Sequence, residues 1–130
     1  MALILVIDDD QDMRNLLRLK LEQSGYEVVE AADGAEGIEL YQEKPADLVI
    51  TDIFMPKKEG LELIREFRKN FLNVKIIAIS GGGPEKLNGL PVYDFLELAK
   101  KMGALHIFKK PVDFEKLLKA VDDILKPGKG

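Results

Sequence analysis

The sequence predicts a single α/β domain in which helices cover both faces of a parallel five-stranded sheet. Apolar runs of strand length alternate with segments of helical periodicity along the whole chain, which is typical of repeated strand–helix units. The first, third and fourth of these runs are almost wholly apolar, as strands buried on both faces should be. A length of 130 residues fits one domain and leaves no room for a second.

Each element is predicted from its own local signal. The strands are short apolar runs, and the helices place apolar side chains on one face at spacings of three and four. Gly25, Pro45 and Gly103 stand where the first, second and fourth helices should end. In chain order, the expected strands cover residues 2–7, 26–31, 48–51, 74–79 and 105–108, and the expected helices cover residues 10–24, 34–44, 63–71, 95–102 and 114–125.

The polar residues within the strands predict their order in the sheet. Strands two and five contain Glu27, Glu30 and His106, which edge strands tolerate better than central ones. The order 2-1-3-4-5 therefore fits the hydrophobicity. In that order the chain reverses direction between strands one and three, and ligands bind at such a switch point beyond the carboxyl ends of the strands.

Composition and charge exclude several classes of function. The net charge is −4 and no basic block stands out, so nucleic-acid binding is not expected. The chain has no cysteine, which excludes disulfides and thiolate metal sites and fits a reducing cytoplasm. The apolar run 2–7 is too short to span a membrane or to act as a signal sequence, so no membrane association is expected.

Polar side chains occur where four of the predicted strands end. A packed core gains nothing from this arrangement, and clustered carboxylates repel one another unless a cation lies among them. Mg²⁺ prefers such oxygen ligands, lysine offers a compact charge for phosphate, and a carboxylate is a possible nucleophile toward phosphorus. The residues are Asp8, Asp9 and Asp10 after strand one, Asp52 after strand three, Ser80 after strand four and Lys110 after strand five. Asp10 is also a candidate helix N-cap.

These motifs, taken together and in this order, resemble the response-regulator receiver family of two-component signalling. The resemblance covers essentially the whole chain and implies a doubly wound, flavodoxin-like (βα)5 fold for residues 1–126. The remaining residues, 127–130, are expected from their sequence to form a disordered tail. The matching motifs are Leu5-Val-Ile-Asp-Asp9, Asp52-Ile-Phe-Met-Pro56 with Gly60, Ile79-Ser80-Gly81 and Lys110-Pro111.

The resemblance also implies a role for each site residue. Asp52 would accept a phosphoryl group from the phosphohistidine of a sensor histidine kinase, or from a phosphotransfer protein. Asp8 and Asp9 would hold Mg²⁺ together with Asp52 and the backbone carbonyl of Phe54. Ser80 and Lys110 would contact the phosphoryl oxygens, and a cis peptide bond would precede Pro111.

As a receiver, the domain would catalyse only its own phosphorylation and dephosphorylation. Phosphorylation would shift an equilibrium between two states of the surface around strands four and five and helices four and five, which a downstream protein would recognise. These 130 residues contain no output domain, which is compatible with a stand-alone receiver and with the receiver part of a longer protein.

Three features depart from the usual receiver pattern. Many receivers have an aromatic residue three positions before the lysine, where this chain has Ile107, while Phe108 is expected on the opposite face of the strand. The segment 81–91, expected to be a mobile irregular loop, makes the connection to helix four unusually long. Phe54 is bulky and apolar, which predicts slow dephosphorylation through shielding of the phosphoryl group.

Other functions of this fold are less well supported by the residues. A phosphorylation-independent protein-binding module is the main alternative, although all the acceptor residues are present. A phosphatase with an aspartyl nucleophile commonly has a second aspartate two residues later, where this chain has Phe54. A flavin carrier shares only the fold class, and fold does not determine function. His106, the only histidine, is expected to be an edge-strand residue without a metal role.

Overall fold

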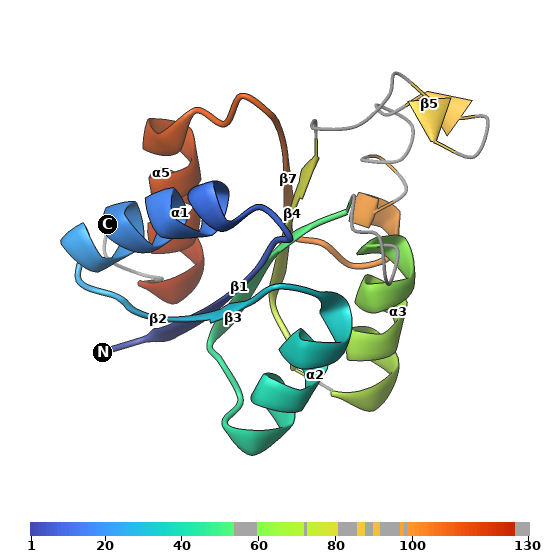
Figure 1. Cartoon of the computed structure of the whole chain (residues 1–130), viewed down its shortest axis with the longest axis horizontal. Helices are drawn as coiled ribbons and strands as arrows, with labels where there is room; N and C mark the ends of the chain where they lie inside the picture. The colour runs from blue at the N-terminus through green and yellow to red at the C-terminus, as the bar shows by residue number, and fades with distance from the viewer. Residues whose placement is uncertain are drawn as a thin grey trace.

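The predicted α/β architecture is confirmed by a computed structural model of the chain. It describes residues 1–53, 60–71, 73–80, 86–87, 90–91, 97 and 99–126. Five parallel strands form one sheet in the order β2-β1-β3-β4-β7, which is the predicted 2-1-3-4-5 in chain order. Helices α1 and α5 cover one face, and α2 and α3 cover the other (Figure 1). The predicted tail, 127–130, lies outside the described residues.

The observed elements match the predicted ones in type, and their ends differ by at most three residues. Of the predicted fourth helix, residues 97 and 99–102 are described; residues 97 and 99–101 are helical, and Met102 is in a turn. The strands of the large sheet are β1 Leu3–Ile7, β2 Glu27–Ala31, β3 Leu48–Asp52, β4 Ile76–Ser80 and β7 His106–Lys109. The helices that the structure describes from end to end are α1 Gln11–Gln23, α2 Gly34–Glu43, α3 Gly60–Asn70 and α5 Phe114–Leu125.

Strand β1 lies near the centre of the sheet and divides its side chains between two hydrophobic layers. Leu3, Leu5 and Ile7 belong to the cluster on the side of α2 and α3, where Ile38, Leu63 and Phe67 are buried. Ile4 and Val6 belong to the opposite cluster, with Leu17 and Leu21 of α1 and Leu117 and Val121 of α5. This alternation follows from the two-residue period of a strand, and it fixes the register of β1 firmly.

Aspartate caps start the helices immediately after the strands. The Asp10 carboxylate accepts hydrogen bonds from the backbone N–H groups of Asp12 and Met13, at 2.9 and 3.3 Å. Asp33 and Asp113 cap α2 and α5 in the same way. The predicted cap at Asp10 is confirmed, and only two residues, Asp8 and Asp9, separate the end of β1 from this cap. The turn that carries them is therefore short and held at both ends.

The expectation of an irregular loop over 81–91 was partly wrong. Lys86–Leu87 (β5) and Leu90–Pro91 (β6) pair as a small antiparallel sheet, while residues 81–85 and 88–89 lie outside the described residues. The sequence between the two strands is Asn-Gly, which is the strongest short-range signal for a hairpin. Figure 1 shows β5 apart from the large sheet.

Candidate functional site

Three predicted carboxylates meet at the carboxyl edge of the sheet. Ile7 and Thr51 are paired neighbours in the parallel ladder of β1 and β3, so the residues that follow them, Asp8 and Asp52, also lie side by side. Asp8 and Asp52 are buried, whereas Asp9 is exposed. One carboxylate oxygen from each of the three residues lies within 4.8 Å of the others.

Lys110 reaches this cluster from the neighbouring part of the sheet. It follows β7, and its ammonium Nζ lies 3.0 Å from Oδ2 of Asp52 and 3.4 Å from Oδ2 of Asp8. The adjacent Lys109 is exposed. The sequence-based choice of Lys110 over Lys109 is therefore consistent with the geometry. The predicted cis peptide between Lys110 and Pro111 is present.

The Asp8 carboxyl is destabilised in its charged form. Burial raises its pKa from 3.8 to about 6, and the nearby Asp52 carboxylate adds to this effect. The backbone N–H of Asp10, 2.9 Å from Oδ1, and the Lys110 ammonium act in the opposite direction without cancelling it. Lys110 therefore does not offset the cost of burying the Asp8 carboxylate, and a further cation would favour its ionised form.

The same environment favours the charged form of Lys110, whereas it disfavours the charged form of Asp8. Burial alone would lower the pKa of Lys110, but the charges and hydrogen bonds of Asp52 and Asp8 outweigh it, so the pKa is raised. Lys110 therefore stays positively charged at neutral pH and forms a charge-assisted contact with both aspartates.

Two predicted site residues are described only in part or not at all. Ser80 is the last residue of β4 and pairs with Lys109 of β7, which places its backbone at the same edge of the sheet. Its side chain lies outside the described part of the structure, as does the whole of Phe54. The roles expected for the Ser80 hydroxyl and the Phe54 carbonyl stay predictions.

The donor set at this edge fits a hard divalent cation. Mg²⁺ takes oxygen ligands at about 2.1 Å in an octahedron, so its ligand oxygens lie roughly 3–4 Å apart. The carboxylate oxygens of the cluster lie within 4.8 Å of one another, so small side-chain adjustments would bring them to that spacing. Burial, with a smaller contribution from the Asp52 carboxylate, raises the pKa of Asp8, and a cation bound between the carboxylates would offset both effects.

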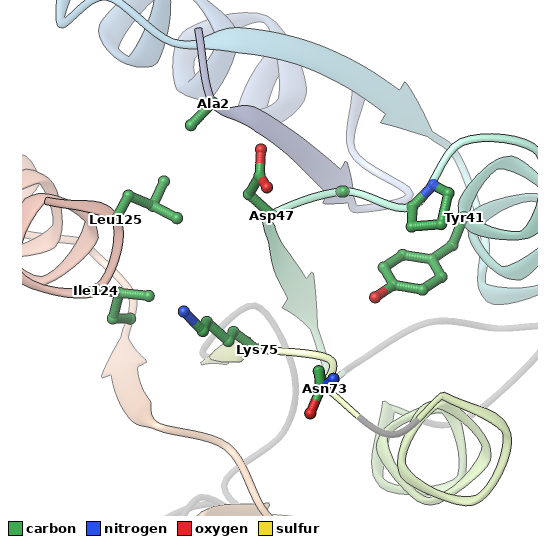
Figure 2. Close-up of a pocket in the computed structure, with 9 residues that line it drawn as sticks. Ala2, Tyr41, Asp47, Asn73, Lys75, Ile124 and Leu125 are labelled. Carbon is green, nitrogen blue, oxygen red and sulfur yellow. The ribbon is translucent and has the colours of Figure 1, made fainter. Parts of the chain in front are cut away.

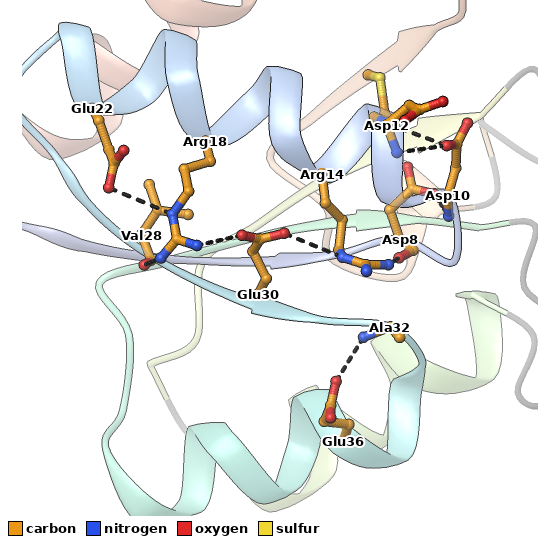
Figure 3. A network of polar contacts seen from close by, with 11 residues as sticks. Asp8, Asp10, Asp12, Arg14, Arg18, Glu22, Val28, Glu30, Ala32 and Glu36 are labelled. Carbon is orange, nitrogen blue, oxygen red and sulfur yellow. Dashed lines mark hydrogen bonds and ion pairs between the residues drawn. The ribbon is translucent and has the colours of Figure 1, made fainter.

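Sequence reasoning missed a partly buried ion-pair network behind this turn. Arg14 of α1 donates a hydrogen bond from Nη1 to the backbone carbonyl of Asp8, at 2.6 Å, and its Nε lies 3.2 Å from Oε1 of Glu30 on β2. Arg18, one turn further along α1, pairs with the other oxygen of Glu30 (Figure 3). The sequence signal that could have indicated this network is a pair of arginines four residues apart on a helix, with a glutamate on the adjacent strand.

A separate cavity lies at the opposite edge of the sheet. It measures about 650 Å³ and includes Tyr41, Asp47, Lys75 and Leu125 in its lining (Figure 2). Asp47 and Lys75 precede β3 and β4, so this is the amino edge of the strands. The cavity contains none of the residues that the sequence analysis identified as a site.

The residue at the usual aromatic position is half-buried and apolar. Ile107 packs against the cluster on the side of α2 and α3, whereas Phe108 packs against the cluster on the side of α1 and α5. The prediction that Phe108 faces away from Ile107 is confirmed. His106 is exposed and its ring stacks with that of Phe108, at 6.4 Å between centroids, as expected for an edge-strand residue.

The fold and the carboxylate–lysine cluster at its switch point define a receiver-type signalling domain. The family model described as "Response regulator receiver domain" matches residues 4–122. The chain belongs to this family. Its relatives support a role in phosphorylation-based two-component signalling, and receiver domains are generally switches rather than metabolic enzymes.

Similar proteins include both short receivers and long regulators. The chain is 35% identical to the response regulator receiver protein CpdR of Brucella abortus, over 96% of this chain and 98% of that one. It is 34% identical to the chemotaxis protein CheY of Halobacterium salinarum, over 94% and 95%. A crystal structure of a receiver domain protein from Clostridium thermocellum aligns with a TM-score of 0.85 at 33% identity, covering 99% of this chain and 98% of that one.

The chain matches only part of some relatives. It is 33% identical to the transcriptional regulatory protein GlrR of Escherichia coli over 95% of this chain, but it spans only 26% of that protein.

Among the described helices, none combines the length and apolar character that a membrane crossing requires.

Proposed function

We propose that this domain is a phosphorylation-dependent switch in which Asp52 accepts the phosphoryl group. The observation that carries the proposal is the contact of Lys110 with Asp52, at 3.0 Å, within a cluster of three carboxylates. The donor we propose is a phosphohistidine, on a sensor histidine kinase or on a phosphotransfer protein. Two similar proteins support a phosphorelay of this kind, a sensor kinase/phosphatase of Vibrio cholerae and a sporulation initiation phosphotransferase of Bacillus subtilis.

The residues have distinct tasks in the proposed transfer. A carboxylate oxygen of Asp52 forms a bond to phosphorus as the bond from phosphorus to the donor histidine nitrogen breaks. The products are an aspartyl phosphate and a neutral imidazole, because the leaving ring carries a proton on its other nitrogen or takes one from water. Asp8 and Asp9 would hold Mg²⁺, with Asp52 and the carbonyl of Phe54. The bound ion would neutralise charge on the phosphoryl oxygens.

Lys110 and Ser80 would stabilise the phosphorylated state. The Lys110 ammonium already lies beside both buried aspartates, so it needs only a small shift to pair with a phosphoryl oxygen. The hydroxyl of Ser80, at the end of β4, would add a hydrogen bond. The resulting surface change around β4, β7 and α5 would be recognised by a downstream protein. We propose that the domain acts in the cytoplasm.

The effect of phosphorylation would be transmitted to the output surface by a route that differs from that of many receivers. Ile107 has no aromatic ring to change its rotamer, and its side chain packs into the apolar cluster beside α2 and α3. We therefore propose that the change is transmitted without an aromatic side chain at position 107.

The first experiment is phosphorylation of the purified chain by acetyl phosphate, read by intact mass. With Mg²⁺ present we expect the addition of one phosphoryl group, lost on treatment with hydroxylamine, which cleaves acyl phosphates. With EDTA we expect no addition. A chain that binds Mg²⁺ but gains no mass from acetyl phosphate or from a phosphohistidine donor would support the alternative, a phosphorylation-independent binding module of the same fold.

Lys110→Met is expected to slow phosphorylation by acetyl phosphate roughly 100-fold, because loss of a single charge-stabilising group at a reaction centre typically costs this much. Methionine keeps most of the side-chain length but removes the ammonium that contacts Asp52 and Asp8. The matched control is Lys109→Met, since Lys109 is exposed and one residue away. Initial rates measured by intact mass should be unchanged in that control, and equal slowing of both variants would argue against a role for Lys110.

A further inference from the structure

We propose that Arg14 is a positioning residue for the metal-binding turn, acting through the backbone carbonyl of Asp8. The inference rests on the proposed function, because it concerns the Mg²⁺ affinity of the same site. Arg14 lies on the first turns of α1, on the helix face that meets β2, and its side chain is largely buried. Its guanidinium donates to the Glu30 carboxylate and to the backbone carbonyl of Asp8, so we infer that its effect on the metal passes through the turn.

The contact fixes the peptide unit between the two proposed metal ligands. Arg14 donates from Nη1 to the carbonyl oxygen of Asp8, at 2.6 Å (Figure 3). That carbonyl and the N–H of Asp9 belong to one planar peptide group, so holding the oxygen restricts rotation of the backbone at both residues. The N–H of Asp8 is held as well, by the carbonyl of Ala31 at 3.1 Å.

Asp9 depends on this restraint more than Asp8 does. The Asp8 carboxylate is buried and accepts hydrogen bonds from Asp10 and Lys110. The Asp9 carboxylate is exposed, and within the described part of the chain no hydrogen bond or ion pair holds it. Its distance from the other carboxylates is therefore set by its backbone, which Arg14 orients.

The guanidinium is itself held in a fixed orientation. One oxygen of Glu30 accepts from Arg14 Nε and the other from Arg18 Nη1, so both carboxylate oxygens are used. Arg18 also donates from Nη2 to the carbonyl of Val28, at 2.9 Å. A planar guanidinium offers donors in fixed directions, which lets Arg14 bind Glu30 and Asp8 simultaneously; a lysine ammonium lacks that geometry.

The simpler reading is that this network only ties α1 to β2. Arg18 offers a matched test, because it ties α1 to β2 through Glu30 and Val28 without touching Asp8. Both arginines contribute to the same helix–strand contact. Only Arg14 contacts the turn that carries the metal ligands, so the two residues should differ in their effect on metal affinity alone.

The experiment is Mg²⁺ titration by isothermal calorimetry on the wild-type chain, Arg14→Ala, Arg14→Lys and Arg18→Ala, with urea unfolding of each in EDTA. We expect Arg14→Ala and Arg14→Lys to raise the Kd for Mg²⁺ about 10-fold or more, the usual effect of losing a group that orients metal ligands. Arg18→Ala should change the Kd less than about 2-fold, although it lowers the urea midpoint by a similar amount to Arg14→Ala. If Arg14→Ala does not fold, Glu30→Gln releases the guanidinium with a milder change.

The outcomes separate the inference from the proposed function. Wild-type binding of Mg²⁺ with a greatly weakened Arg14→Ala and a nearly unchanged Arg18→Ala would support the positioning role. Wild-type binding with equal Kd values for the two alanine variants would overturn the positioning role and leave the proposed function intact. Absence of Mg²⁺ binding by the wild-type chain would overturn both.

Discussion

Asp52→Asn is expected to abolish phosphorylation by acetyl phosphate. Asparagine keeps the shape of the side chain, but its carboxamide lacks the anionic oxygen that would attack phosphorus. Asp52 is buried at the end of β3 and its Oδ2 lies 3.0 Å from the Lys110 ammonium, closer than Oδ2 of Asp8 at 3.4 Å. Intact mass after incubation with acetyl phosphate and Mg²⁺ should show the unmodified chain alone, whereas the wild-type chain gains one phosphoryl group.

Asp10→Asn is the matched control for this variant. Asp10 lies at the same edge of the sheet, but its carboxylate caps α1, and asparagine is an equally good N-cap. We expect Asp10→Asn to be phosphorylated like the wild-type chain and to unfold at a similar urea concentration. A hydroxylamine-labile phosphoryl group on Asp52→Asn would place the acceptor on another carboxylate and contradict the assignment.

The location of this site was predictable because it depends on strand order alone. In a parallel sheet all carboxyl ends lie at one edge, so residues that follow neighbouring strands become neighbours in space. Asp8 and Asp52 follow paired positions of β1 and β3, and the sequence supplied both positions and the order of the strands. Ile107 and Phe108 were assigned to opposite faces by the same simple periodicity.

The contacts that position the site were not predictable in the same way. Arg14 acts on a backbone carbonyl, which is present at every residue and gives no sequence signal. Its partner Glu30 looked like an ordinary edge-strand residue, because the direction of its carboxylate depends on how α1 packs across β2. The burial of Asp8 and the exposure of its neighbour Asp9 likewise follow from the path of a short turn, which composition does not specify.

The small β5–β6 ladder was missed for a different reason. The glycines and prolines around residues 81–91 were interpreted together as an irregular loop. The Asn88-Gly89 dipeptide between two apolar positions is a hairpin signal that outweighs the average character of the segment. Local turn chemistry, rather than overall composition, predicts the pairing of Lys86–Leu87 with Leu90–Pro91.

Asp8→Asn is expected to stabilise the metal-free domain at neutral pH while removing its stabilisation by Mg²⁺. The pKa of Asp8 rises from 3.8 to about 6 on folding, mainly through burial, so the folded state binds the proton more tightly than the unfolded state. Asp8 therefore lowers the free energy of unfolding as pH rises from about 4 through about 6. Above that range the free energy of unfolding is lower by roughly 2–3 kcal/mol than it would be without this shift.

Asparagine removes this loss and keeps the main hydrogen bond. Its side-chain carbonyl still accepts from the N–H of Asp10, as Oδ1 of Asp8 does at 2.9 Å. Urea unfolding in EDTA should show wild-type stability falling between pH 4 and pH 7 relative to Asp8→Asn, so that the variant is the more stable protein at pH 7. In the variant, Lys110 still forms its ion pair with Asp52, so the substitution does not leave the lysine charge without a partner.

Mg²⁺ should reverse the order of the two proteins. A ligand that binds only the folded state stabilises it in proportion to the logarithm of its concentration over Kd, and the variant lacks one of the ligands that would bind it. The wild-type urea midpoint at pH 7 should therefore rise with Mg²⁺, while that of Asp8→Asn stays nearly constant. Asp10→Asn, changed in the same turn, should behave like the wild-type chain. If Mg²⁺ stabilised Asp8→Asn as much as the wild-type chain, Asp8 would not be a metal ligand, and its burial would need another explanation.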